Sequence, residues 1–561
     1  MNDTQRTYAY AIGLIIGSLF ITPVFGLSMS TVGVPLTLAL LSGLFAVVGV
    51  YGSIAISNDD THSALTVAIL VLMTVGANVP LGPQPDGVTI GSIIFVVDGA
   101  LIILGAISLR SWRRQEIGRE HIFFLFYVTW VTVLIVAAPG PRSDVMVWYS
   151  VHVARYVAAF IVIARSVSSG WIEASKALGV VILTILGHAI VATFQAITGP
   201  IEGLTVLGFN TRVVATFGPL PTGPYIGGFT GGSAFASLVI IAIPVVFSYI
   251  FSDRVPRIFS LVGTVWLAFI LQLTAWDAAR GALLVSLYTC LAVFGWWYTD
   301  VIWSRGDAIS DVWNQSRLRI QLISVISLII TAATVWQYTR FNSNVEYDPV
   351  FLDPELGQAT IQSINIPGFS TENLGIRIHQ YVGGIDIFLQ YPLTGLGGAN
   401  YNYIALAYAD KQNMIHNMYI GVLAETGIVG AILLFGGIMI VLLRVWTIAK
   451  TEDSPVWLGL LVGLIGFFSL QLLQPQYLRP VTMTSVFGIL GIITGKYLRD
   501  NPPDDDIWAD AWTHSQLISA INHSTSLKII ESIPERLSEM TESVRPRFQR
   551  QFASAVRWLM D

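Results

Sequence analysis

Apolar runs of about 20 residues, separated by polar connections, repeat along most of the chain. A helix of this length crosses a bilayer, because every backbone polar group must be hydrogen-bonded within the spanning segment. On this basis we predict about fourteen membrane-spanning helices. Their starts lie near Tyr8, Gly33, Ala64, Thr89, His121, Val147, Ser175, Gly232, Pro256, Arg280, Leu318, Asn417, Pro455 and Pro480. The pattern therefore predicts an all-α polytopic membrane protein.

The composition supports the membrane class. Hydrophobic residues make up 54% of the 561 positions and charged residues only 12%, and the mean hydropathy is +0.67. These values lie far outside the balance of soluble domains. We expect membrane lipids as neighbours and no nucleic-acid partner. The single cysteine, Cys290, excludes an intrachain disulfide.

Basic residues in the connections predict the orientation. They follow the even-numbered spans, at Arg110, Arg113, Arg114, Arg119, Arg165, Lys176, Arg254, Arg257, Arg305, Arg317, Arg319, Arg444 and Lys450. The positive-inside rule then places both termini in the cytoplasm of a cell whose plasma membrane holds the chain. The two longest connections on the opposite face are 199–231 and 338–416, the second between spans eleven and twelve. Loops of this length between membrane helices are uncommon unless they are functional.

Charged side chains also lie on the outer face, where the positive-inside rule disfavours basic residues. They occur in the first long loop, in a very short hairpin, and in a segment that we predict to be an amphipathic helix on the membrane surface. In that order they are Arg212, then Asp277 and Arg280, then Arg377, His379 and Asp386. The predicted surface helix leads to His416 and Asn417 at the start of span twelve, with Glu425 further into that span.

An outer cavity lined by arginine and histidine suits a phosphate-bearing lipid. Guanidinium groups bind phosphate through two parallel hydrogen bonds, and imidazole exchanges a proton near neutral pH. Sugar transfer from a lipid phosphate needs both, because the departing charge must be held while the incoming hydroxyl loses its proton. We assign phosphate binding to Arg280 and Arg377, with Arg212 as a further donor-binding residue, and proton transfer to His416. No His, Asp and Glu set has metal-ligand spacing, so we expect a metal-independent reaction without a cofactor.

Several segments resemble the O-antigen ligase and polysaccharide polymerase superfamily. They occur in the order of that family, from Arg212 to Phe435. The segments are TRVVATFG, GGSAFASLVIIAIPVVF, LQLTAWDAARGALL, GIRIHQYVGGIDIFLQYPLTGLGGANY and HNMYIGVLAETGIVGAILLF. By this resemblance Arg280 and Arg377 fall on the family's arginines, and His416 with Asn417 falls on the pair that closes its large loop.

The resemblance implies an enzyme with a GT-C-like membrane fold. Its activity would be transfer of a glycan from a polyprenyl (di)phosphate donor to an acceptor hydroxyl on the outer face, with inversion at the sugar. The family includes ligases, polymerases and protein O-oligosaccharyltransferases, so the acceptor is a glycan, a lipid or a protein.

Structural interpretations stand beside these assignments. Arg212 and Arg280 could be interfacial arginines that extend to the membrane surface, and His379 is expected at the surface. His416 could simply precede a helix that Asn417 caps. Glu425 lies nine residues past His416 and is half a turn out of phase with it at about 100° per residue, so we treat it as a supporting residue. His188 is a candidate partner for Glu425.

Two other classes of protein remain open. Asp98, His152 and Arg155 lie within spans four and six, where they could pair with one another or form a proton path. A proton path would favour a secondary transporter of a lipid-linked or small polar substrate. If the chain were a structural or assembly protein of the membrane, the outer arginines would need no chemical role.

The chain divides by composition into two parts. Residues 1–499 form the membrane-embedded domain that carries both long loops. Residues 500–561 begin with an acidic linker, NPPDDDIWADAW, and continue with apolar residues at intervals of three and four. The second part therefore predicts a cytoplasmic tail with amphipathic helices at the inner leaflet, and a partly disordered tail is the alternative.

Overall fold

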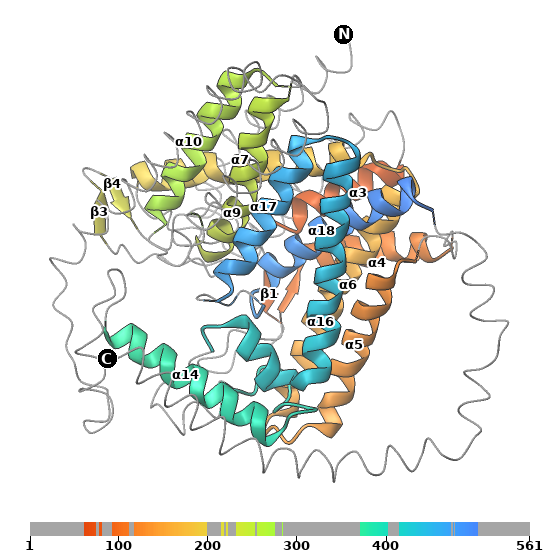
Figure 1. Cartoon of the computed structure of the whole chain (residues 1–561), viewed down its shortest axis with the longest axis vertical. Coiled ribbons are helices and arrows are strands. Elements are labelled where there is room, and N and C mark those ends of the chain that lie inside the picture. Colours follow the sequence, from red (N-terminus) through yellow and green to blue (C-terminus); the bar gives the residue numbers. More distant parts are fainter. Residues whose placement is uncertain are drawn as a thin grey trace, which may run out of the picture.

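A computed structural model describes the central and C-terminal helices of the chain (Figure 1). The described residues are 61–74, 78–80, 93–110, 117–198, 215–217, 220–222, 232–252, 255–274, 283, 371–401, 415–472, 475 and 477–502. The spans predicted to start near Tyr8, Gly33, Arg280 and Leu318 lie outside these residues, as does the tail beyond residue 502.

Helices make up the described structure, in agreement with the predicted class. They are α3 (Thr61–Leu72), α4 (Val96–Arg110), α5 (Arg119–Ala137), α6 (Ser143–Ser168), α7 (Ala174–Thr198), α9 (Gly232–Ser248), α10 (Arg257–Leu273), α14 (Thr371–Gln390), α16 (Met418–Thr451), α17 (Pro455–Leu470) and α18 (Pro480–Asp500), with the 3₁₀ turn η2 (Tyr249–Phe251). Each of these α-helices except α14 begins close to a predicted span. Helix α14 covers the segment predicted as an amphipathic surface helix.

Two short antiparallel strand pairs accompany the helices and were not predicted. Strand β1 (Asn78–Pro80) pairs with β2 (Ile93–Phe95), directly before α4. Strand β3 (Ala215–Phe217) pairs with β4 (Leu220–Thr222) within the first long loop. Three-residue strands carry too little alternation to be recognised in a sequence rich in apolar residues.

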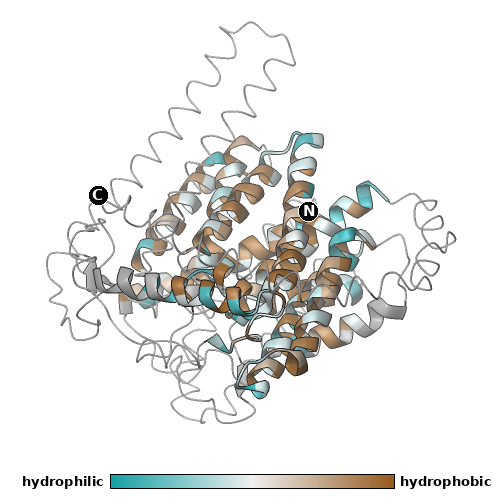
Figure 2. Ribbon diagram, turned by 60° about the horizontal axis from the view of Figure 1, so that its bottom comes forward, coloured by the Kyte–Doolittle hydropathy of each residue, from teal (hydrophilic) through white to brown (hydrophobic). Residues whose placement is uncertain are grey.

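Among the described residues, six helices are long and apolar enough to cross a membrane: α5, α6, α7, α9 with its 3₁₀ extension, α16 and α18. Helices α10 and α17 are also apolar but shorter. Figure 2 shows apolar residues along most of the length of these helices. The chain is therefore a polytopic membrane protein, while the count of about fourteen spans stays a prediction.

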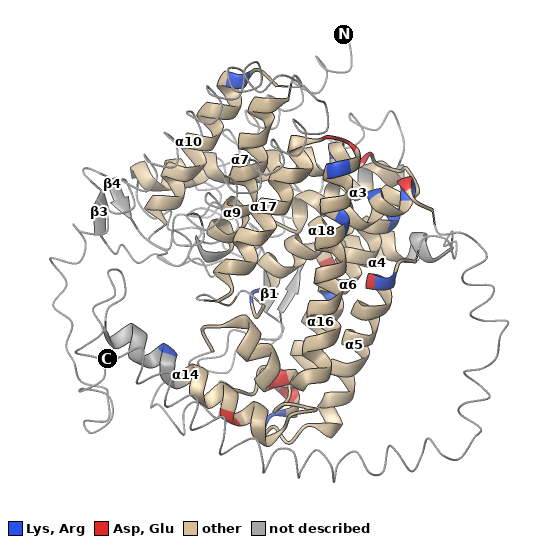
Figure 3. Cartoon of the chain, viewed as in Figure 1, with Lys and Arg blue, Asp and Glu red and all other residues tan. Residues whose placement is uncertain are grey.

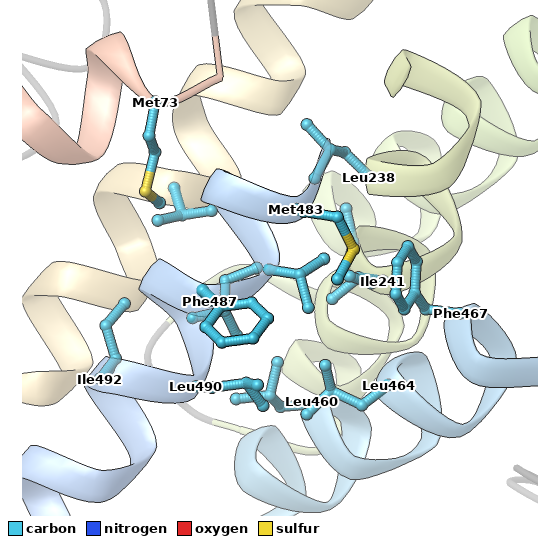
Figure 4. Packing of buried hydrophobic residues seen from close by; sticks show 14 of the residues in the cluster. Met73, Leu238, Ile241, Leu460, Leu464, Phe467, Met483, Phe487, Leu490 and Ile492 are labelled. Carbon is cyan, nitrogen blue, oxygen red and sulfur yellow. The ribbon is translucent and has the colours of Figure 1, made fainter. Parts of the chain in front are cut away.

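The core lies where α9, α17 and α18 meet (Figure 4). Phe487 and Met483 of α18 pack there with Phe467 and Leu464 of α17 and Ile241 of α9, all nearly or fully buried. Glycine allows the backbones of α9 and α17 to approach each other. A Cβ atom at Gly463 would lie 2.5 Å from the carbonyl oxygen of Ile241. The close packing of α9 against α17 therefore requires glycine at this position.

One end of the bundle gathers the ion pairs of the predicted cytoplasmic connections; we call it the basic end. There Arg444 of α16 pairs with the buried Glu120 of α5 at 2.6 Å. Lys496 of α18 pairs with Asp500 at 2.8 Å and also with Glu452. Figure 3 shows that acidic and basic residues concentrate near the helix ends.

The opposite end, which we call the loop end, comprises the described residues of 138–142, 391–401, 415–417, 471–472, 475 and 477–479. Contacts across the bundle establish it: the Arg142 N–H donates to Asn400 at 3.0 Å, and the Met418 N–H donates to the carbonyl of Gln471 at 2.8 Å. Helix α9 runs antiparallel to α17 and α10, so α9 begins and α10 ends on this side. The described residues next to the segments that carry Arg212 and Arg280, which are the start of α9 and the end of α10, therefore lie at the loop end.

Candidate functional site

Helix α16 folds back on itself at Gly427. This glycine has φ 67° and ψ −173°, and the rings of Tyr419 and Phe435 lie 5.1 Å apart. In a straight helix these two residues would be separated by about 24 Å along the axis. The prediction of one continuous span from Asn417 is therefore wrong. A first arm (418–426) meets a second arm (428–451) at Gly427, as Figure 1 shows.

The loop 391–400 satisfies the backbone groups that the break exposes. The N–H groups of Leu396 and Gly397 donate to the carbonyls of Ala424 and Glu425 at 2.8 and 2.9 Å. The indole N–H of Trp130 donates to the carbonyl of Thr426 at 2.9 Å. A broken helix inside a membrane protein needs such partners, because an unsatisfied buried carbonyl costs several kcal/mol. The glycine-rich loop is thus part of the same unit as the first arm.

Asn417 caps the first arm of α16. Its Oδ1 accepts the backbone N–H groups of Tyr419 at 2.9 Å and Ile420 at 3.0 Å. Asparagine is among the preferred residues for this position. The structural interpretation of Asn417 is confirmed, and the cap fixes the helix start immediately after His416.

His416 is held by two adjacent residues of α14. Its Nδ1 lies 2.7 Å from Oε1 of Gln380, and its backbone N–H lies 3.2 Å from the same oxygen. The Tyr381 hydroxyl lies 3.0 Å from each of the carbonyl oxygens of His416 and Leu472, which share its single hydrogen. The surface helix and the α17–α18 connection therefore meet at the histidine.

Arg377 lies one helical turn before Gln380 and Tyr381 on α14. Burial raises the pKa of the Tyr381 hydroxyl above its ordinary value, and the positive charge of Arg377 opposes this shift. The hydroxyl is therefore protonated at neutral pH and donates to the carbonyl oxygen of His416. The structure thus places Arg377, which was predicted to share a site with His416, one helical turn from the two residues of α14 that contact the histidine.

The structure describes only some of the other predicted site residues. Arg212, Asp277 and Arg280 lie outside the described residues. The start of α9 and the end of α10, which flank these segments, lie at the loop end, and this is the side of the bundle that carries His416. His379 is a residue of α14, between Arg377 and Gln380, and the structure describes its backbone only.

Glu425 lies in the first arm of α16 and is 1% exposed. The Ala399 N–H donates to its carboxylate, and the Tyr477 hydroxyl faces it. The suggested partner His188 is wrong, because Nε2 of His188 instead lies 3.0 Å from the hydroxyl of Thr74. Glu425 therefore contacts the loop 391–400 and the α17–α18 connection, and its supporting role in the site stays a prediction.

Asp98, His152 and Arg155 pair with one another inside the bundle. The Arg155 guanidinium donates to both carboxylate oxygens of Asp98, at 2.5 and 2.8 Å, and its Nη1 lies 2.5 Å from Nδ1 of His152. The bidentate geometry joins α4 to α6 and matches the expected internal pairing.

Sequence reasoning missed three residues at the loop end. Gln380 and Tyr381 directly follow the predicted Arg377 and His379, but neither glutamine nor tyrosine in a surface helix signals a histidine partner. Arg479, on the α17–α18 connection, carried a usable signal, because the predicted orientation places this basic residue on the outer face. Burial lowers the pKa of its guanidinium, and its enclosed Nε has no hydrogen-bond partner among the described residues.

No group of three or more His, Cys, Asp or Glu side chains in the described part of the chain is arranged to hold a metal ion. The described site therefore offers arginine, histidine, glutamine and tyrosine side chains. These groups bind anions and transfer protons.

The fold and the candidate site define a polytopic helical membrane protein in which α14, the helix that carries Arg377, contacts His416. Residues 265–435 match the family model described as O-Antigen ligase. The matched segment includes α14, the loop 391–400, the first arm of α16 with Gly427, and the start of the second arm. The resemblance to the O-antigen ligase and polymerase-like superfamily is confirmed by this match. No curated protein matches the chain.

Proposed function

We propose that the chain is a glycosyltransferase that moves a glycan from a polyprenyl (di)phosphate donor to an acceptor hydroxyl on the outer face of the plasma membrane. The observation that supports it best is that Gln380 and Tyr381, one helical turn from Arg377, contact His416, within the segment that matches the ligase family. Basic and proton-accepting groups at one point are what transfer from a lipid phosphate requires.

In the proposed reaction the acceptor oxygen attacks the anomeric carbon of the donor glycan. Its proton passes to His416, a new carbon–oxygen bond forms, and the bond from the anomeric carbon to the phosphate oxygen breaks. The electron pair of that bond leaves with the polyprenyl (di)phosphate. Arg377, together with Arg280 and Arg212, stabilises the negative charge that develops there. One displacement of this kind inverts the anomeric configuration and needs no metal ion.

The remaining parts of the site serve the two substrates. The polyprenyl tail lies among the apolar helices, and the long loop 338–416 covers the donor head group. The acceptor is a hydroxyl of a glycan, a lipid or a protein, which corresponds to ligase, polymerase or protein O-glycosylation activity. Asn417, Asp277, His379 and Glu425 support the reacting residues.

The experiment is a transfer assay with purified protein in nanodiscs and a polyprenyl-diphosphate glycan as donor. Glycan, lipid and peptide acceptors are supplied in separate reactions. We expect His416→Ala and Arg377→Ala each to lower turnover by about 100-fold or more, since general-base catalysis and charge stabilisation each supply about that much. Arg142→Ala is the control for Arg377→Ala, because Arg142 is already paired with Asp144. His62→Ala, on α3, is the control for His416→Ala.

The outcomes separate the claims. Full turnover by His416→Ala and Arg377→Ala with every acceptor would contradict the proposed site. Loss of wild-type activity on addition of a chelator would contradict metal independence. Retained configuration at the transferred sugar, determined by NMR of the product, would contradict the single displacement.

A further inference from the structure

The contact between Gln380 and His416 fixes which ring nitrogen carries a proton. Two groups of His416 approach the same amide atom of Gln380, the backbone N–H at 3.2 Å and the ring Nδ1 at 2.7 Å. A backbone N–H can only donate, so the amide atom that faces it must be the oxygen and not the nitrogen. The orientation of the Gln380 amide is therefore set by chemistry.

The same oxygen determines the tautomer of the imidazole. An amide oxygen has no proton to give, so Nδ1 at 2.7 Å must be the donor and carries the hydrogen. A neutral imidazole has one N–H, and its other nitrogen holds the basic lone pair. In neutral His416 that nitrogen is Nε2.

The surroundings hold this geometry in place. Gln380 is 4% exposed, and its neighbour Tyr381 donates to the carbonyl of His416, so α14 contacts the ring and the backbone of the histidine together. The close approach of α14 to the first arm depends on Gly384, where a Cβ atom would lie 2.6 Å from Ile420 and 2.8 Å from Ile415. The Gln380 oxygen accepts both bonds from His416, while its buried Nε2 has no hydrogen-bond partner among the described residues.

We propose that Gln380 is a positioning residue of the transferase: it holds His416 in the Nδ1–H tautomer, so that Nε2 is the atom that takes the acceptor's proton. This inference rests on the proposed function for its catalytic part. During transfer the proton moves from the acceptor oxygen to Nε2, and the Nδ1–H of the resulting imidazolium stays hydrogen-bonded to Gln380. The glutamine is neutral, so it orients the ring without the added basicity that a carboxylate partner gives.

The first test is direct and independent of activity. The full chain, labelled with ¹⁵N-histidine and reconstituted in lipid, contains eight histidines, and the signal of His416 is assigned by its loss in His416→Ala. We expect the neutral ring of the wild type to show a protonated Nδ1 and an unprotonated Nε2. In Gln380→Leu the Nδ1–H tautomer loses its acceptor, and the population shifts toward Nε2–H. A wild-type ring protonated at Nε2, or an unchanged population in Gln380→Leu, would overturn the proposal.

The second test uses kinetics. We expect Gln380→Leu to lower kcat by about 10- to 100-fold with the donor KM within about twofold, because the ring is misdirected while the phosphate contacts remain. Gln380→Glu keeps the acceptor and stabilises the imidazolium, so activity is largely rescued and the acid limb of the pH–rate profile moves to higher pH. Equal losses in both variants, with no shift of the profile, would indicate a merely structural role and overturn the proposal.

A matched control comes from the neighbouring position. Tyr381→Phe removes a bond to the backbone of His416 but leaves the ring contact, so its tautomer should equal that of the wild type; a change as large as that in Gln380→Leu would overturn the assignment to Gln380. The proposed function and the role of Gln380 fail in different experiments. If wild-type His416 has the Nδ1–H tautomer but the protein transfers no glycan, the proposed function is wrong. If the protein transfers glycan while His416 has the opposite tautomer, only the role of Gln380 is wrong.

Discussion

Arg142 and Arg479 are two arginines at the loop end that differ in their counter-charge. Arg142 donates to both oxygens of Asp144, at 2.9 and 2.7 Å, so its charge is neutralised within the chain. Arg479 is half-buried, and no described residue supplies it with an acid. A half-buried guanidinium without an acidic partner among the described residues is suited to an anionic ligand, which in the proposed function is the donor phosphate.

This difference predicts the behaviour of the two variants. Arg479→Gln removes a charge-assisted contact of about 1.5–3 kcal/mol, so the donor KM should rise by about 10- to 100-fold. Arg142→Gln should leave the donor KM within about twofold of the wild type. Steady-state kinetics in the nanodisc transfer assay measures both. Equal KM values for Arg479→Gln and the wild type would exclude Arg479 from donor binding.

Asn417 allows a prediction about stability at the same scale. Asn417→Ala deletes the acceptor of two N–H groups at the start of α16 and should cost about 1 kcal/mol. Asn417→Ser, which retains a capping oxygen, should recover most of the loss. Thermal unfolding in detergent reports the order of the three proteins. An alanine variant as stable as the wild type would show that the cap contributes nothing.

At the scale of elements, the fold-back of α16 depends on Gly427. Its φ of 67° is unfavourable for any residue with a Cβ atom, and an added Cβ would collide with the backbone of Leu393. Gly427→Ala should therefore destabilise the protein by about 2–4 kcal/mol and reduce transfer, since His416 directly precedes the cap of the first arm. Gly187→Ala in α7, where the new Cβ meets nothing within 4 Å, is the matched control and should be neutral or slightly stabilising. A fully stable and active Gly427→Ala would contradict the geometry of the break.

The contrast between α14 and α16 shows what the sequence can predict at this scale. The apolar run after Asn417 predicts a helix correctly, because length and hydropathy alone decide its formation in a membrane. The fold-back is not encoded in that run, since Ile428 finds its backbone partner at Pro392, far away along the chain. The pairing of Gln380 with His416 is hidden for the same reason. Arg377 and His416 could be predicted as candidates because their chemistry is distinctive, whereas a glutamine acceptor is chemically ordinary.

For the whole molecule, the ion pair between Arg444 and Glu120 connects α5 to the second arm of α16 at the basic end. Glu120 is fully buried, so Glu120→Gln leaves a largely buried guanidinium without its partner and should cost about 3–5 kcal/mol. The exposed pair of Lys176 and Glu173 is the comparison, and Glu173→Gln should change stability by less than about 0.5 kcal/mol. Unfolding transitions of the two variants in one detergent test the difference, and equal shifts would contradict it.

The distribution of polar groups between the two ends predicts how the molecule lies in the membrane. The loop end carries the site, and the basic end carries the arginines and lysines that the positive-inside rule assigns to the cytoplasm. With Cys290 replaced by serine the chain has no cysteine, so single cysteines can report each face. Ser143→Cys lies exposed at the loop end and Thr451→Cys lies exposed at the basic end. In intact cells a membrane-impermeant maleimide should label Ser143→Cys, and Thr451→Cys should react only after permeabilisation. The reverse pattern would place His416 in the cytoplasm, where an acceptor on the outer face is out of reach, and the transferase would then act on the inner leaflet.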